Sequence, residues 1–140
     1  MHIDKNTFCV APWYSLFVAA DGKIAPCCEF QTQDHRYDQI EEYFVSENLK
    51  KVRQDLLNGV KNANCNTCWK AEENKGDSLR LISNRTIAAG TESPIMDQIR
   101  DPRLENIKSF DLTLGNLCNL KCVMCYPGLS SQLLAEVKTH

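Results

Sequence analysis

The sequence has little of what marks a nucleic-acid-binding or membrane-spanning protein. Its 16 lysines and arginines are outnumbered by 18 aspartates and glutamates, so the net charge is −2 and no basic surface is expected. No apolar run reaches the roughly 18 residues that a membrane-spanning helix needs. A small basic cluster, Lys50, Lys51 and Arg53, lies among acidic residues and predicts a solvated helix face.

The N-terminus also lacks the pattern of a secretory signal. Asp4 precedes the first apolar stretch, and Pro12 interrupts it. We therefore expect a cytoplasmic, reducing location, where disulfides are rare. Against that background the chain has eight cysteines, which favours metal or redox chemistry over a disulfide framework.

The first two thirds of the chain predict a hairpin followed by helices. Residues 14–26 contain, in order, a β-rich run, the turn Asp21-Gly22 and a short return strand. Residues 39–58 have apolar residues at helical spacing, with Ser46 as an internal N-cap. A short helix is expected from Trp69, and a longer one from residue 77 or 78 to residue 90. Residues 91–106 contain two prolines and many charges, which predicts a linker.

The last third predicts a strand, a cysteine loop and a helix. Residues 107–114 alternate apolar and polar side chains and end at Gly115. Cys118, Cys122 and Cys125 follow within eight positions, and a second apolar pattern with helical spacing begins after Gly128. A closed metal site needs four protein ligands, so a cluster held by three cysteines would keep one position open for another molecule.

This C-x3-C-x2-C loop after a strand resembles the cluster motif of the radical S-adenosylmethionine (radical SAM) enzymes. The resemblance implies that Cys118, Cys122 and Cys125 hold a 4Fe-4S cluster whose open iron binds SAM. It further implies reductive cleavage of SAM to a 5′-deoxyadenosyl radical, with flavodoxin or ferredoxin as the electron donor. Met124 and Tyr126, beside the third cysteine, are the implied SAM contacts.

The other five cysteines form a second group, which is Cys9, Cys27, Cys28, Cys65 and Cys68. Their segments, FCVAPW, DGKIAPCC and CNTCW, resemble half of a SPASM domain, often called a twitch domain. Such a domain carries an auxiliary iron–sulfur cluster in radical SAM enzymes that modify peptides and other substrates. The resemblance implies metal binding by this group, with Cys27 as a ligand and Cys28 as the spare thiol. Trp13 and Trp69 are expected to pack around the site.

Together these features predict an α+β protein. Residues 1–90 would form a small cysteine-rich twitch module, a β-hairpin plus helices. Residues 91–106 would form the linker, and residues 107–140 the first strand, loop and helix of a truncated (β/α) radical SAM barrel. The family's barrel has further strands that enclose SAM. We therefore expect this sequence to be the N-terminal part of a longer enzyme. The alternative is a natural short protein, such as a remnant or a split half, and in either case we expect these residues to be inactive alone.

An alternative interpretation is a non-catalytic module that binds zinc for folding or for contact with a partner. Zinc accepts the same all-thiolate ligand set. At the three-cysteine loop, zinc would need a distant fourth ligand, for which His35 and His140 are the candidates.

Overall fold

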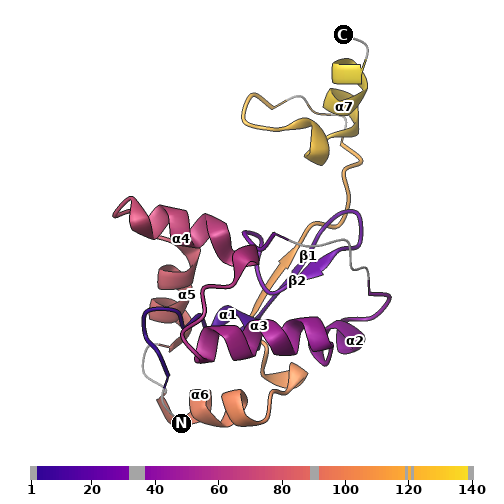
Figure 1. Cartoon of the computed structure of the whole chain (residues 1–140). Helices are drawn as coiled ribbons and strands as arrows, with labels where there is room; N and C mark the ends of the chain where they lie inside the picture. Colours follow the sequence, from indigo (N-terminus) through magenta and orange to yellow (C-terminus); the bar gives the residue numbers. More distant parts are fainter. Residues whose placement is uncertain (1–2, 32–36, 89–91, 119, 121, 139–140) are drawn as a thin grey trace.

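The computed structural model describes residues 3–31, 37–88, 92–118, 120 and 122–138 (Figure 1). The strands are β1 (Ser15–Val18), β2 (Ile24–Ala25) and β3 (Ser109–Leu112). The α-helices are α1 (Ala11–Tyr14), α2 (Ile40–Phe44), α3 (Glu47–Leu57), α4 (Asn66–Glu73), α5 (Leu79–Ala88), α6 (Glu92–Arg100) and α7 (Ser131–Lys138). The short 3-10 helices are η1 (Ala63–Cys65), η2 (Leu104–Asn106) and η3 (Pro127–Leu129).

The strands form one sheet in the order β2-β1-β3. The predicted hairpin is confirmed: β1 and β2 are antiparallel, with Phe17 opposite Ala25. Gly22 supplies the positive φ of the connecting turn, at +82°, which glycine adopts without steric cost. The expected late strand is β3, which pairs parallel to β1 and places Leu16 opposite Phe110.

This topology places the two groups of cysteines at opposite ends of the sheet. Cys9 precedes the hairpin and Cys27 follows it, so both lie toward the end where β1 begins. The three-cysteine loop leaves the carboxyl end of β3, which the parallel pairing puts beside the end of β1. Figure 1 shows the C-terminal segment with α7 extending from the sheet, away from α1 to α6.

Capping side chains explain where the middle helices begin. Ser46 accepts a hydrogen bond from the Leu49 amide at 3.2 Å and separates α2 from α3, as the sequence predicts. Ser78 accepts from the Leu81 amide at 3.2 Å at the start of α5. Helix α4 begins at Asn66, three residues before the predicted start at Trp69.

The stretch expected to be a linker is largely a packed helix. Residues 92–100 form α6, and its Ile95 and Ile99 are buried in one cluster with Val10 and Trp13. Pro94 falls in the first turn, where proline costs no intrahelical hydrogen bond. The proline and the charges thus mark the start and the outer face of a helix rather than a flexible connection.

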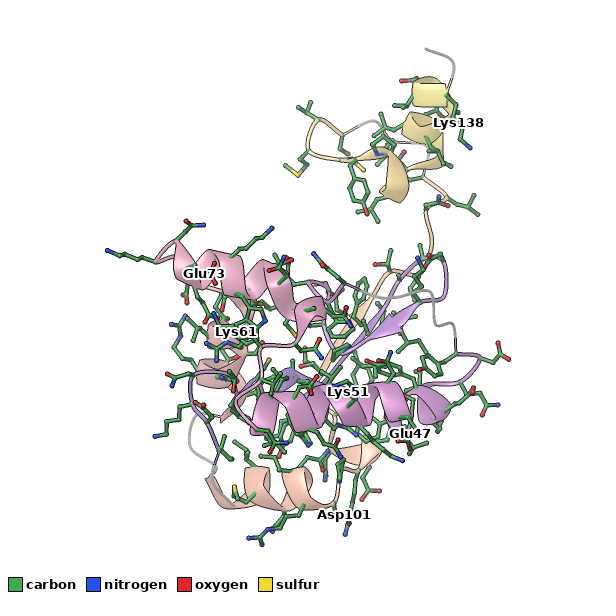
Figure 2. All side chains as sticks on the ribbon, in the orientation of Figure 1. Glu47, Lys51, Lys61, Glu73, Asp101 and Lys138 are labelled. Carbon is green, nitrogen blue, oxygen red and sulfur yellow. The ribbon has the colours of Figure 1, made fainter. Side chains whose placement is uncertain are left out.

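The small basic cluster is also not uniformly solvated. Lys50 and Lys51 are exposed (Lys51 is labelled in Figure 2), but Arg53 is only 6% exposed. Its guanidinium donates to the carbonyls of Pro12 at 3.0 Å and Phe44 at 3.1 Å, and lies 4.4 Å from the centre of the Phe44 ring. Burial lowers the pKa of Arg53 to about 10. Arg53 therefore holds α1 and the end of α2 together from inside the protein.

Three buried apolar clusters make up the core. One contains Cys9, Val52, Leu56 and Trp69, and so joins the first cysteine segment to α3 and α4. The others pack α1 against α6, and the sheet against α2 and α3. No helix of the described residues has the length and apolarity needed to cross a membrane.

The core cluster around Cys9 yields a stability prediction. Leu56 is 0% exposed, so we expect Leu56→Ala to lower the free energy of unfolding by about 2–5 kcal/mol through lost burial and a residual cavity. Urea unfolding under reducing conditions measures the change. The matched control is Leu114→Ala, because Leu114 is 93% exposed and its truncation should change the free energy by less than about 0.5 kcal/mol. Equal effects of both substitutions would contradict this core.

Candidate metal centre

Four cysteine thiols line one cavity. They are Cys9, Cys27, Cys65 and Cys68, and the cavity wall is completed mainly by Ala11, Phe30, Leu79, Arg80 and Ser83. All eight cysteines are free, so these thiols are available as ligands. Soft thiolate ligands select zinc, copper(I) or iron–sulfur clusters. The donor set therefore fits a thiolate-bound metal or cluster.

Three separate segments deliver these thiols. Cys9 lies just before α1, and Cys27 lies just after β2, so the hairpin brings the two together. Cys65 and Cys68 lie at the end of η1 and in the first turn of α4. A hydrogen bond from the Gln31 amide to the Asn64 carbonyl, at 2.8 Å, ties the chain after Cys27 to the loop before Cys65. This bond thus holds the segment that carries Cys27 next to the segment that carries Cys65.

The thiols are shielded from water. Cys9 and Cys68 are buried, and Cys27 and Cys65 are half-buried. Burial is the main reason that the pKa values of Cys9, Cys27 and Cys65 rise to about 12, and the neighbouring thiols raise them further. These groups are therefore protonated at neutral pH without a metal. The positive charge of a bound metal would have to displace the protons.

The thiol donor set suits either a single ion or a cluster. Within the described ranges, no group of three or more His, Cys, Asp or Glu side chains is arranged to hold one metal ion. A zinc ion with bonds of about 2.3 Å to sulfur needs thiolates within about 4 Å of each other. An iron–sulfur cluster has several irons and sulfides between its thiolates, so it bridges a wider set.

Cys28 takes a different position from Cys27. It is exposed and is not part of the cavity wall. Partial burial raises its pKa, and so does its hydrogen bond to the Asp111 carboxylate on β3. The structure thus places Cys27 at the cavity and turns Cys28 toward the sheet. Of these two adjacent thiols, Cys27 is the one at the cavity wall.

One of the two tryptophans borders the site. Trp69 packs in the same core cluster as Cys9, and its indole N–H donates to the Asn62 carbonyl at 2.9 Å. Trp13 instead packs with Val10 and α6. The expectation that both rings surround the thiols therefore holds for Trp69 alone.

Sequence reasoning missed the part of the cavity wall that comes from α5. Leu79, Arg80 and Ser83 lie on this helix, and Arg80 and Ser83 are buried. Charged and hydroxyl residues on a helix normally predict a solvated face. The available signal was their spacing, since positions three and four apart share one face of a helix.

The three-cysteine loop is more open. Cys122 is exposed, and Cys118 and Cys125 are partly exposed. The Cys125 amide donates to the Cys122 carbonyl at 2.9 Å, and the Ser131 amide donates to the Asn116 carbonyl at 2.7 Å. The loop is therefore anchored to the start of α7. In the part of the chain that the structure describes, its cysteines do not converge on a single-ion site.

The two candidate SAM contacts differ in environment. Met124 is 96% exposed. Tyr126 lines a cavity of about 360 Å³ whose wall also includes Phe17, Phe30 and Leu129. The alternative zinc ligands, His35 and His140, lie outside the described residues.

Comparison with known proteins found a family model that matches the N-terminal part of the chain. Residues 9–69 match the family model SPASM, an iron–sulfur cluster-binding domain. A search of curated proteins and a search of solved structures each found no match. The matched segment contains the four cysteines that line the cavity and ends at Trp69. Residues 9–69 are therefore similar to a SPASM module, and this similarity points to iron–sulfur cluster binding by the segment.

Proposed function

We propose that Cys9, Cys27, Cys65 and Cys68 bind an auxiliary iron–sulfur cluster in a radical SAM enzyme. The observation that carries the proposal is the convergence of these thiols on one shielded cavity inside the segment that matches the SPASM model. Thiolates are the usual ligands of such clusters, and a buried, apolar wall protects a cluster from solvent.

The second half of the proposal concerns the loop after β3. Cys118, Cys122 and Cys125 would hold a 4Fe-4S cluster, and SAM would occupy the open iron position. That cluster would supply the electron that cleaves SAM to methionine and a 5′-deoxyadenosyl radical. The support is the order of strand, loop and helix, since ligands bind at the carboxyl ends of parallel strands in α/β folds. Both Tyr126 and Met124 are exposed, at 60% and 96%, but Tyr126 also lines a cavity and so suits a SAM contact better.

We expect no turnover from these 140 residues alone. Cys122 and Met124 are exposed to solvent, and a radical reaction needs a site from which water is excluded. An active enzyme would need further protein around this loop. It would also need an electron donor, such as flavodoxin or ferredoxin, and a substrate, for which peptides are one candidate class.

The ligand assignment predicts the metal content of cysteine variants. Wild-type protein, purified and reconstituted anaerobically, should contain roughly eight irons per chain, two four-iron cubes. Replacing Cys118, Cys122 and Cys125 with Ala should leave about four. Replacing Cys9, Cys27, Cys65 and Cys68 with Ala should remove the other half. Iron analysis per chain measures both losses.

The control for these variants is Cys28→Ala, because Cys28 lies outside the cavity wall. It should keep the wild-type iron content. A Cys28→Ala protein that loses half of its iron would transfer the ligand role from Cys27 to Cys28. A triple variant that keeps its full iron content would refute the assignment of the loop.

Zinc binding at the same thiols is the competing function, and sulfide content distinguishes the two. An iron–sulfur site contains acid-labile sulfide in a ratio of about one to each iron, whereas a zinc site contains none. We expect sulfide to match iron after anaerobic reconstitution. Zinc that stays bound through iron and sulfide treatment, without sulfide, would establish the structural role instead.

A further inference from the structure

We propose that helix α5 is part of this metal centre, with Arg80 and Asn84 as positioning residues for Cys9. Arg80 also places a positive charge beside the thiolates, and this charge favours the reduced state of a bound cluster. The inference rests on the proposed iron–sulfur function. It concerns a helix that lies outside the segment matched by the SPASM model, which ends at residue 69.

The peptide groups on both sides of Cys9 are held by α5. Arg80 Nη1 and Asn84 Nδ2 each donate to the Phe8 carbonyl at 2.8 Å. The Val10 amide donates to Asn84 Oδ1 at 2.8 Å. Arg80 and Asn84 are four residues apart and therefore share one face of the helix. The backbone of Cys9 is thus fixed before and after the thiol.

Arg80 also belongs to the cavity itself. Its side chain lines the wall together with the four thiols, and the residue is only 5% exposed. Arg80 is therefore among the immediate neighbours of the thiols.

The guanidinium of Arg80 is held by Glu72 and by the ring of Trp69. It forms a two-pronged ion pair with Glu72, in which Nε donates to Oε1 at 2.8 Å. Ser78 donates to the same Glu72 oxygen at 2.6 Å. Burial alone would raise the pKa of Glu72, but the hydrogen bonds from Arg80 and Ser78 lower it, so the carboxylate is ionised. The guanidinium also lies 5.1 Å from the centre of the Trp69 ring.

A fixed cation matters because a cluster held by four thiolates gains a further negative charge on reduction. A buried positive charge stabilises that added charge more than the same charge in water would. Net charge, hydrogen bonding and exposure are the features that set cluster potentials. Arg80 lines the cavity and its partner Glu72 does not. The other charged residue in the wall is Glu29, which is exposed to solvent, so Arg80 is the buried charge at the site.

The test compares Arg80→Gln, Arg80→Lys and the control Arg85→Gln. Arg85 is on the same helix, but its side chain is 61% exposed and pairs with Asp77 at the surface. All are made with Cys118, Cys122 and Cys125 replaced by Ala, so that only the cluster at the N-terminal thiols contributes to the signal. Anaerobic redox titration, followed by visible absorption and electron paramagnetic resonance, gives the ratio of reduced to oxidised cluster.

At the wild-type midpoint potential, Arg80→Gln should lower this ratio roughly tenfold, which is 59 mV for a one-electron couple. Arg80→Lys keeps the charge and should stay near the wild type, as should Arg85→Gln. An unchanged ratio in Arg80→Gln, at normal iron content, would overturn the role of the charge. A merely structural role would reduce iron content without moving the potential of the cluster that remains.

Arg80→Gln leaves Glu72 without its partner, which could impair folding. The double variant Arg80→Gln/Glu72→Gln removes both charges, and it should still lower the ratio because the buried charge in the cavity wall is lost. If the double variant keeps the wild-type ratio, the proposal that Arg80 sets the potential is wrong.

Hydrogen exchange tests the positioning role without any metal. Asn84→Ala removes the acceptor for the Val10 amide, so we expect this amide to exchange at least tenfold faster than in wild type and in Arg85→Gln. Unchanged exchange would overturn the positioning role. Wild-type protein that takes up no iron would refute the proposed function and the effect on potential, whereas exchange at Val10 would still decide whether α5 positions Cys9.

Discussion

The rest of the structure depends on one constraint, which is that residues 7–14 run through the interior and their backbone groups need hydrogen-bond partners there. Only α1 is regular in this segment, so side chains of the surrounding helices provide the partners. Arg53 of α3 binds the Pro12 carbonyl, Asn84 of α5 binds both neighbours of Cys9, and Gln98 of α6 binds the Trp13 carbonyl at 2.9 Å. Polar side chains from three helices therefore all bind the backbone of this one segment.

This constraint connects the fold to the metal centre. Cys9 is in the middle of the buried segment, so the contacts that satisfy the backbone also fix the direction of its thiol. Cys27 is placed by the hairpin, and Cys65 and Cys68 by the entry into α4. Each thiol is therefore held by an element whose contacts with the rest of the protein do not involve a bound metal. Such support from surrounding groups is what a metal site needs to keep its ligands in place.

Sequence patterns predicted the parts of the structure that depend on local signals. The turn at Asp21-Gly22 and the cap at Ser46 follow from neighbouring residues. The grouping of the N-terminal cysteines came from the resemblance to a SPASM domain. The parts that depend on burial of polar groups were missed. In the sequence, Arg53 and Arg80 look like solvated charges on a helix, because the carbonyls that they bind are not visible there. Helix α6 looks like a linker, because its charges and Pro94 outweigh the signal of its two buried isoleucines.

The aromatic ring of Phe30 links two regions that the chain keeps apart. It packs against the core cluster around Cys9, and it also lines the cavity that Tyr126 reaches from the C-terminal segment. The Phe30 side chain thus forms part of the wall of both the thiol cavity and the Tyr126 cavity. Because one ring lines both cavities, the shape of each depends on where this single side chain lies.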